Sequence, residues 1–181
     1  MKGIVFSEFI EMVEDVFSPE VADKIIEEAD LPSGGAYTAV GTYDHQEILS
    51  LVTNLSNETG MSIPDLVRTF GTHLASRFTA LYPSFFEGTS GTFNFLETIE
   101  NHVHVEVLKL YPDAELPTFT TVNDDGVNMT MIYKSRRPFA DLAEGLIRGC
   151  ATHFGDDISI ERDDSKEGDT FVTVFKMTKN N

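Results

Sequence analysis

The hydrophobic period of this sequence changes near its middle, and that change is the strongest constraint on its fold. Up to Pro112, apolar residues recur at three- and four-residue steps, as they do on one face of a helix. Beyond it, short segments alternate and are rich in β-branched and aromatic residues, which is typical of strands. A helical N-terminal half packed on an antiparallel sheet, with one helix inserted between strands, predicts an α+β fold. The predicted strands cover residues 118–122, 128–133, 158–162 and 170–175.

Turn and cap residues set the boundaries of these elements. Ser18 followed by Pro19 predicts a helix cap and a first helical residue. The sequence Asn-Asp-Asp-Gly at residues 123–126 predicts a hairpin turn, and a second, polar turn is expected at residues 163–168. The predicted helices cover residues 6–17, 19–26, 44–60, 62–78, 93–111 and 139–154.

Length and charge limit the number of domains and the kinds of partner. The chain of 181 residues is long enough for one domain, in which we expect residues 1–62 to form an N-terminal helical subdomain and residues 63–181 a helical and sheet portion. A net charge of −17 repels phosphate backbones and anionic lipids, so we expect neither nucleic acid nor membrane as a partner. The acidic N-terminus and the single cysteine, Cys150, favour a cytoplasmic protein without a disulfide or a multi-cysteine zinc site.

Two of the five histidines, His102 and His104, lie two residues apart in a segment with helical periodicity. Residues two apart on a helix do not face each other, so the pair should not share a metal ion. His104 falls on the edge of the apolar stripe, and His102 on the other side. Two interpretations of His104 stay open: a core histidine bonded to a backbone carbonyl, or a single axial ligand to a metal whose cofactor supplies the other ligands.

A second candidate group is Tyr133-x-Ser135-x-Arg137 at the end of a predicted strand. On an extended chain these three side chains point the same way. Two hydroxyls and a guanidinium suit a carboxylate, because arginine binds it with two hydrogen bonds and hydroxyls satisfy its remaining lone pairs. The alternative is an ordinary polar strand edge.

Taken together, these residues resemble the H-NOX family, the haem nitric oxide/oxygen-binding domains. The resemblance is carried by Met1-Lys2-Gly3, by the helix from His104 to Pro112, by Pro117, by the Tyr-x-Ser-x-Arg motif and by Gly145-Leu146. It implies haem b, with residues 63–181 as the haem-ligating portion and His104 as the proximal iron ligand. The resemblance favours His104 over His102 because the seven-residue step from His104 to Tyr111 matches the family spacing.

The resemblance also implies roles for the other pocket residues. Tyr133, Ser135 and Arg137 would hold the haem propionates, and Pro117 would press on the macrocycle and distort it. Positions that match the family's haem pocket are Val5, Phe78 and Leu146.

The choice of gas depends on hydrogen-bond donors beside the bound ligand. Oxygen-binding members stabilise bound oxygen with a distal tyrosine, and a donor in a dry pocket contributes roughly 1–3 kcal/mol. The matching position here is Leu142, and the two supporting positions are Phe9 and Leu74, all apolar. We therefore expect nitric oxide and carbon monoxide to bind, and oxygen not to bind stably.

The implied activity is signalling rather than catalysis. Nitric oxide would break the bond between iron and His104, the haem would relax, and the N-terminal helices would shift through Val5 and Phe9. Because no output domain follows, we expect regulation in trans of a histidine kinase or a cyclic-di-GMP enzyme, along the acidic face of Glu8, Glu11 and Glu14.

Other functions remain as alternatives. One is an oxygen or redox sensor, and another is a haem peroxidase that uses His73 and Arg77 beside Leu74. Some relatives carry a Cys/His zinc cluster near the C-terminus, whereas residues 158–181 contain neither cysteine nor histidine. Cys150 lies in an apolar helix and is expected to be a buried, inert thiol.

Overall fold

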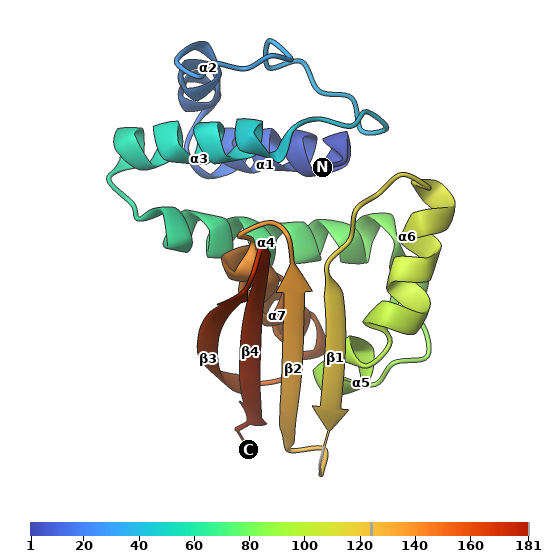
Figure 1. Cartoon of the computed structure of the whole chain (residues 1–181). Helices are drawn as coiled ribbons and strands as arrows, with labels where there is room; N and C mark the ends of the chain where they lie inside the picture. The colour runs from blue at the N-terminus through green and yellow to red at the C-terminus, as the bar shows by residue number, and fades with distance from the viewer. Residues whose placement is uncertain (124, 181) are drawn as a thin grey trace.

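The computed structural model describes residues 1–123 and 125–180 and confirms the α+β class, with a four-stranded antiparallel sheet. In Figure 1, α1, α2 and α3 form an upper layer, α4 crosses the molecule beneath them, and the sheet lies below α4 with α7 behind it. The helices are α1 (Gly3–Val16), α2 (Pro19–Glu27), α3 (His45–Thr59), α4 (Ile63–Leu81), α5 (Thr92–Leu96), α6 (His104–Leu110) and α7 (Ala140–Phe154).

The first helices begin where their capping residues stand. Ser18 Oγ accepts a hydrogen bond from Val21 N at 3.3 Å, and Pro19 is the first residue of α2, as predicted. Asp44 caps α3 in the same way, and α3 ends at Gly60, whose φ of 73° is a left-handed conformation that glycine adopts without strain. Local sequence therefore fixes the length of these helices.

The sheet order is β1 (Thr118–Asn123), β2 (Asn128–Ser135), β4 (Thr170–Lys179) and β3 (Ile158–Glu167), so β1 and β3 are edge strands. All four predicted strands are present. The expected polar turn at residues 163–168 is wrong, because β3 continues to Glu167 and the turn is only Gly168 and Asp169. The hairpin predicted at residues 123–126 includes Asp124, which lies outside the described residues.

The long helix predicted at residues 93–111 is also wrong. The segment forms the short helix α5, then a π-helical turn η2 (Ile99–Val103), then α6. Val103 N donates to Thr98 O five residues back at 3.3 Å, which is the π-helical spacing. The wider turn changes the direction in which later side chains point, and His104 is the first residue after it.

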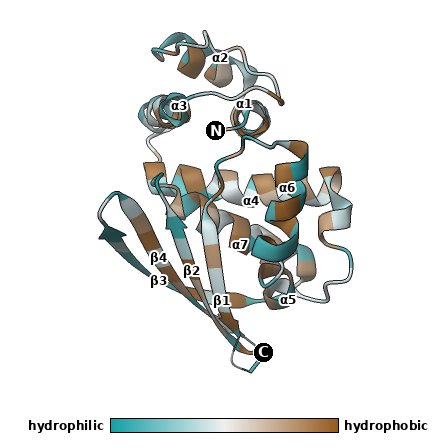
Figure 2. Ribbon diagram, turned by 45° about the vertical axis from the view of Figure 1, so that its right-hand side comes forward, coloured by the Kyte–Doolittle hydropathy of each residue, from teal (hydrophilic) through white to brown (hydrophobic). Residues whose placement is uncertain are grey.

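Two glycines allow α4 and α7 to cross at very close range. A Cβ atom at Gly145 would lie 2.2 Å from Arg68 O, and one at Gly71 would lie 2.5 Å from Leu142 O. Only glycine fits at such a crossing. Apolar residues line both helices and the strands beside them (Figure 2), and Leu146 packs against both of the two buried apolar clusters of the molecule.

Within residues 1–123 and 125–180, no helix is both long enough and apolar enough to cross a membrane.

Candidate functional site

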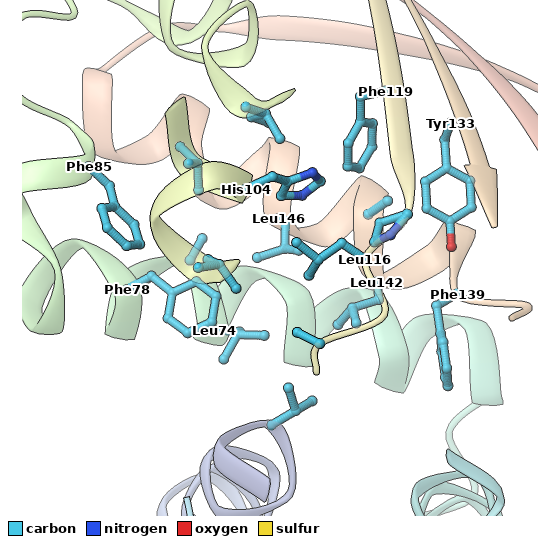
Figure 3. A pocket seen from close by; sticks show the side chains of 18 of the residues that line it. Leu74, Phe78, Phe85, His104, Leu116, Phe119, Tyr133, Phe139, Leu142 and Leu146 are labelled. Atoms are coloured by element: carbon cyan, nitrogen blue, oxygen red, sulfur yellow. The ribbon is translucent and has the colours of Figure 1, made fainter. Parts of the chain in front are cut away.

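A cavity of about 310 Å³ lies between α4, α6, α7 and the β1–β2 hairpin. Figure 3 shows its walls: Leu74 and Phe78 come from α4, Leu142 and Leu146 from α7, and the ring of His104 projects from α6 toward Phe119 and Leu116. The volume lies within the range of about 300–1,000 Å³ that is usual for small-molecule sites. Aliphatic and aromatic side chains make up most of the lining, with a few polar groups at its edges.

His104 is the imidazole that lines this cavity. Its side chain is 14% exposed, and Nδ1 lies 3.3 Å from Glu100 Oε1. Burial lowers the pKa of His104, and Glu100 opposes part of that effect. A neutral imidazole is the form that binds a metal ion. The described residues bring together no cluster of three histidine, cysteine or acidic side chains that could hold a metal ion.

His102 takes a different position. It is exposed, does not line the cavity, and has only a distant edge contact with Phe85, with ring centroids 6.4 Å apart. The structure thus separates the two histidines as the helical spacing predicted, although the intervening backbone is π-helical.

Tyr133, Ser135 and Arg137 all line the cavity. Tyr133 is buried, and its hydroxyl donates to Arg137 O at 3.4 Å. Ser135 Oγ accepts from Arg137 N at 3.0 Å, which orders the chain where β2 ends. The Arg137 guanidinium is 19% exposed and bonds the carboxylate of Glu115. The group therefore already binds a carboxylate through Arg137, as its chemistry indicated.

The apolar residues named from the sequence lie on the cavity wall with one exception. Val5, Leu74, Phe78, Leu142 and Leu146 line the cavity, as does Pro117. Phe9, which we expected beside the ligand, does not itself line the cavity. It is fully buried and packs edge-on against Phe70, with ring centroids 5.2 Å apart.

The structure adds residues that sequence analysis missed. Phe119 links the two candidate groups, because its ring lies 5.7 Å from that of His104 and 5.5 Å from that of Tyr133. Phe119 pairs with Tyr133 across the hairpin, so the strand register was the signal that could have found it. Tyr82 and Tyr111, at the C-terminal ends of α4 and α6, also line the cavity.

Two of these groups stay protonated at neutral pH. Burial, together with a hydrogen bond to Tyr111, raises the pKa of Tyr82 to about 12. Burial raises the pKa of the Cys150 thiol to about 12, so this cavity-lining cysteine carries no charge.

His73 and Arg77 face α1 rather than the cavity. Arg77 Nε donates to Glu8 Oε2 at 2.6 Å, and His73 Nε2 lies 4.0 Å from the same oxygen. Neither residue lines the cavity, so His73 and Arg77 are not placed as the distal histidine and arginine of a peroxidase would be. Glu8 is also only 5% exposed, so the expected acidic face of Glu8, Glu11 and Glu14 is wrong in that Glu8 does not belong to it.

An apolar cavity with one neutral imidazole on its wall and an arginine with two hydroxyls at its edge fits haem. Haem is a flat apolar ring with two carboxylates at one edge, and its iron accepts an axial histidine. The comparisons with known proteins agree. The family model Haem-NO-binding matches residues 2–162. No curated protein sequence matches the chain significantly.

Among solved structures, the Fe(II) unliganded H-NOX protein from K. algicida is 43% identical, with a TM-score of 0.92 over 100% of this chain and 97% of that one. The IWP-051-bound H-NOX from Shewanella woodyi in the Fe(II)CO state is 39% identical, with a TM-score of 0.83 over 99% and 95%. The S. oneidensis H-NOX protein in the Fe(II)NO state is 26% identical, with a TM-score of 0.90 over 100% of both chains. The chain therefore belongs to the Haem-NO-binding, or H-NOX, family of haem-based gas sensors.

Proposed function

We propose that this chain is a nitric oxide sensor that holds haem b through His104 and reports gas binding to a signalling partner. The observation that carries the proposal is the cavity itself, which joins a lone neutral imidazole to the Tyr133, Ser135 and Arg137 group across an apolar interior. Haem would supply an iron with one open position for a diatomic gas. A haem attached through thioether bonds needs a cysteine pair, whereas this sequence has one cysteine, which supports haem b.

Different residues of the cavity would contact different parts of the haem. Arg137 and the two hydroxyls would bind the propionates, with Arg137 exchanging Glu115 for a haem carboxylate. Pro117 lines the same cavity and would bear on the ring, while Val5 and Phe78 would cover it. Burial of His104 keeps the ring unprotonated and ready to bind iron.

Gas selectivity follows from the apolar wall. Leu74 and Leu142 line the cavity and offer no hydrogen bond, so a bound oxygen would lose a stabilisation of roughly 1–3 kcal/mol relative to a pocket with a donor. Nitric oxide and carbon monoxide depend less on such a bond. We therefore propose that the protein binds both of these gases and forms no stable oxygen complex.

Signal transmission would run from His104 to the proposed N-terminal subdomain, residues 1–62. Asp113, three residues after α6, accepts from Lys2 Nζ at 2.9 Å and from Thr42 Oγ1 at 2.9 Å. Release of His104 from iron would displace α6 and Asp113, and residues 1–62 would follow because Lys2 and Thr42 bond that carboxylate. A histidine kinase or a cyclic-di-GMP enzyme, our proposed partner, would respond to the moved surface in the cytoplasm without any catalysis by this chain.

The proposal is tested by absorption spectra of the ferrous haem protein. We expect nitric oxide and carbon monoxide to shift the Soret band, and air to give no stable oxygen complex. Leu142→Tyr places a phenol at the distal wall and should raise oxygen affinity, with Leu142→Phe as the control of similar size without a hydroxyl. A stable oxygen complex in the wild type would contradict the proposed selectivity.

A further inference from the structure

Glu100 lies between the candidate haem ligand and the sheet. It belongs to the π-helical turn η2, four residues before His104. Its Oε1 atom accepts a hydrogen bond from Phe119 N at 2.6 Å and lies 3.3 Å from His104 Nδ1. A backbone N–H of β1 therefore fixes this carboxylate, and the carboxylate in turn faces one nitrogen of the imidazole.

The arrangement selects one form of the His104 ring. With Nδ1 facing a carboxylate, the proton of a neutral imidazole sits on Nδ1, and Nε2 keeps the lone pair that binds a metal. A carboxylate that accepts the Nδ1 proton also makes the ring a stronger electron donor to the metal. The side chain of Glu100 is 34% exposed and that of His104 is 14% exposed, so water weakens this contact only in part.

We propose that Glu100 is a positioning residue for His104, which it orients and makes a stronger axial ligand by accepting the Nδ1 proton while Phe119 N fixes the carboxylate. This inference rests on the proposed function, in which His104 binds haem iron. It adds that the strength of the iron–histidine bond, and hence the ease with which His104 is released, is set from outside the cavity by a residue that does not line it.

The experiment must separate this positioning role of Glu100 from a simpler one, which is to accept a hydrogen bond at the edge of the sheet. β1 is an edge strand, so the outward N–H of Phe119 needs an acceptor, and Glu100 supplies one. Glu100→Gln keeps an oxygen that can accept from Phe119 N, but it removes the negative charge beside His104. Glu97→Gln is the matched control, because it removes a charge from an exposed side chain in the same segment.

The measurement is the iron–histidine stretching band in resonance Raman spectra of the ferrous, gas-free protein. We expect the band to shift to lower frequency in Glu100→Gln and further in Glu100→Ala, and to stay in place in Glu97→Gln. An unchanged band in Glu100→Gln overturns the inference and leaves Glu100 with the strand-edge role alone.

A second measurement uses the wild-type protein and so does not depend on the folding of a variant. In the carbon monoxide complex, the His104 Nδ1 proton should resonate far downfield in the proton NMR spectrum and exchange slowly with water. A resonance at the position of a water-exposed imidazole overturns the inference. The wild type should show an iron–histidine band that is lost in His104→Gly. If no such band exists, the proposed function fails and this inference fails with it. If the band exists but does not move in Glu100→Gln, only the role of Glu100 is refuted.

Discussion

Adding one methyl group at Gly145 should separate the two helices that form much of the cavity wall. A Cβ atom there would lie 2.2 Å from Arg68 O and 2.8 Å from Gly71 Cα, whereas ordinary contact begins at 3.4 Å. Because the neighbouring atoms belong to the backbone, α4 and α7 must move apart by about 1 Å to relieve the clash. Such overpacking costs about 1–3 kcal/mol.

We expect Gly145→Ala to lower the free energy of unfolding, which is opposite to the usual effect of replacing glycine by alanine in a helix. Glycine to alanine inside a helix normally stabilises by about 1 kcal/mol, so the overpacking cost exceeds this gain by about 0–2 kcal/mol. Because the 2.2 Å contact is with a backbone oxygen that cannot rotate away, we expect the upper half of that range, about 1–2 kcal/mol, as the loss in the free energy of unfolding for Gly145→Ala. For a chain of this size that corresponds to a fall in Tm of about 2–8 °C. Haem should also dissociate faster, because Leu142 and Leu146 lie on the same helix and line the cavity.

Thermal and urea unfolding of the haem-loaded protein measure the first effect, and transfer of haem to apomyoglobin measures the second. Ser76→Ala is the control, because Ser76 is an exposed residue of α4 where alanine should stabilise slightly. A Gly145→Ala protein as stable as the wild type, with unchanged haem dissociation, would refute the argument that close backbone contact between α4 and α7 shapes the cavity.

Three further predictions concern the cofactor and the thiol. Arg137→Ala should reduce haem occupancy after reconstitution, because the propionates lose their cation, and Ser135→Ala should reduce it less; equal occupancy in Arg137→Ala and the wild type would count against the propionate assignment. Pro117→Ala should flatten the gas-free haem, which the out-of-plane bands of the resonance Raman spectrum report, and unchanged bands would remove Pro117 from the mechanism. Cys150 should resist iodoacetamide at pH 8 in the folded protein, since burial raises its pKa to about 12 and leaves almost no reactive thiolate at pH 8, whereas labelling at the rate of the unfolded chain would show that the thiol is accessible.

Local sequence signals were sufficient to predict most of the fold. The change of hydrophobic period separated the helices from the sheet, and the cap at Ser18 and Pro19 placed the start of α2. Two boundaries were not predictable in this way. The polar residues 163–167 continue β3 because this edge strand faces water and tolerates charge. The π-helical turn η2 keeps the spacing of apolar residues typical of an α-helix, so the sequence pattern does not reveal the interruption.

The candidate site was predictable where its residues repeat a motif and unpredictable where they depend on long-range contacts. His104 and the Tyr133, Ser135 and Arg137 group follow from spacing and from the family resemblance, and all four line the cavity. Phe9 lies one helical turn after Val5 on the same side of α1, but its ring packs against Phe70 in the buried cluster and does not line the cavity.

Glu8 and Glu100 show the same limit for charged residues. Each is a carboxylate on a helical segment whose partner lies far away in the sequence or in a strand that follows. Periodicity places Glu8 on an acidic face, whereas in the packed structure Glu8 is buried against α4 and pairs with the partly exposed Arg77. Contacts of that kind appear only when the helices are packed.

We propose above all that His104 is the axial ligand of a haem on which gas sensing depends. Replacing His104 and His102 one at a time tests this most directly. Haem content and absorption spectra should be recorded for purified ferrous His104→Gly and His102→Ala, each with and without added imidazole. We expect His102→Ala to bind haem as the wild type does, because His102 is exposed and outside the cavity, and His104→Gly to retain haem only when imidazole is present. Normal haem binding and spectra in His104→Gly without imidazole, or loss of haem in His102→Ala, would contradict this proposal.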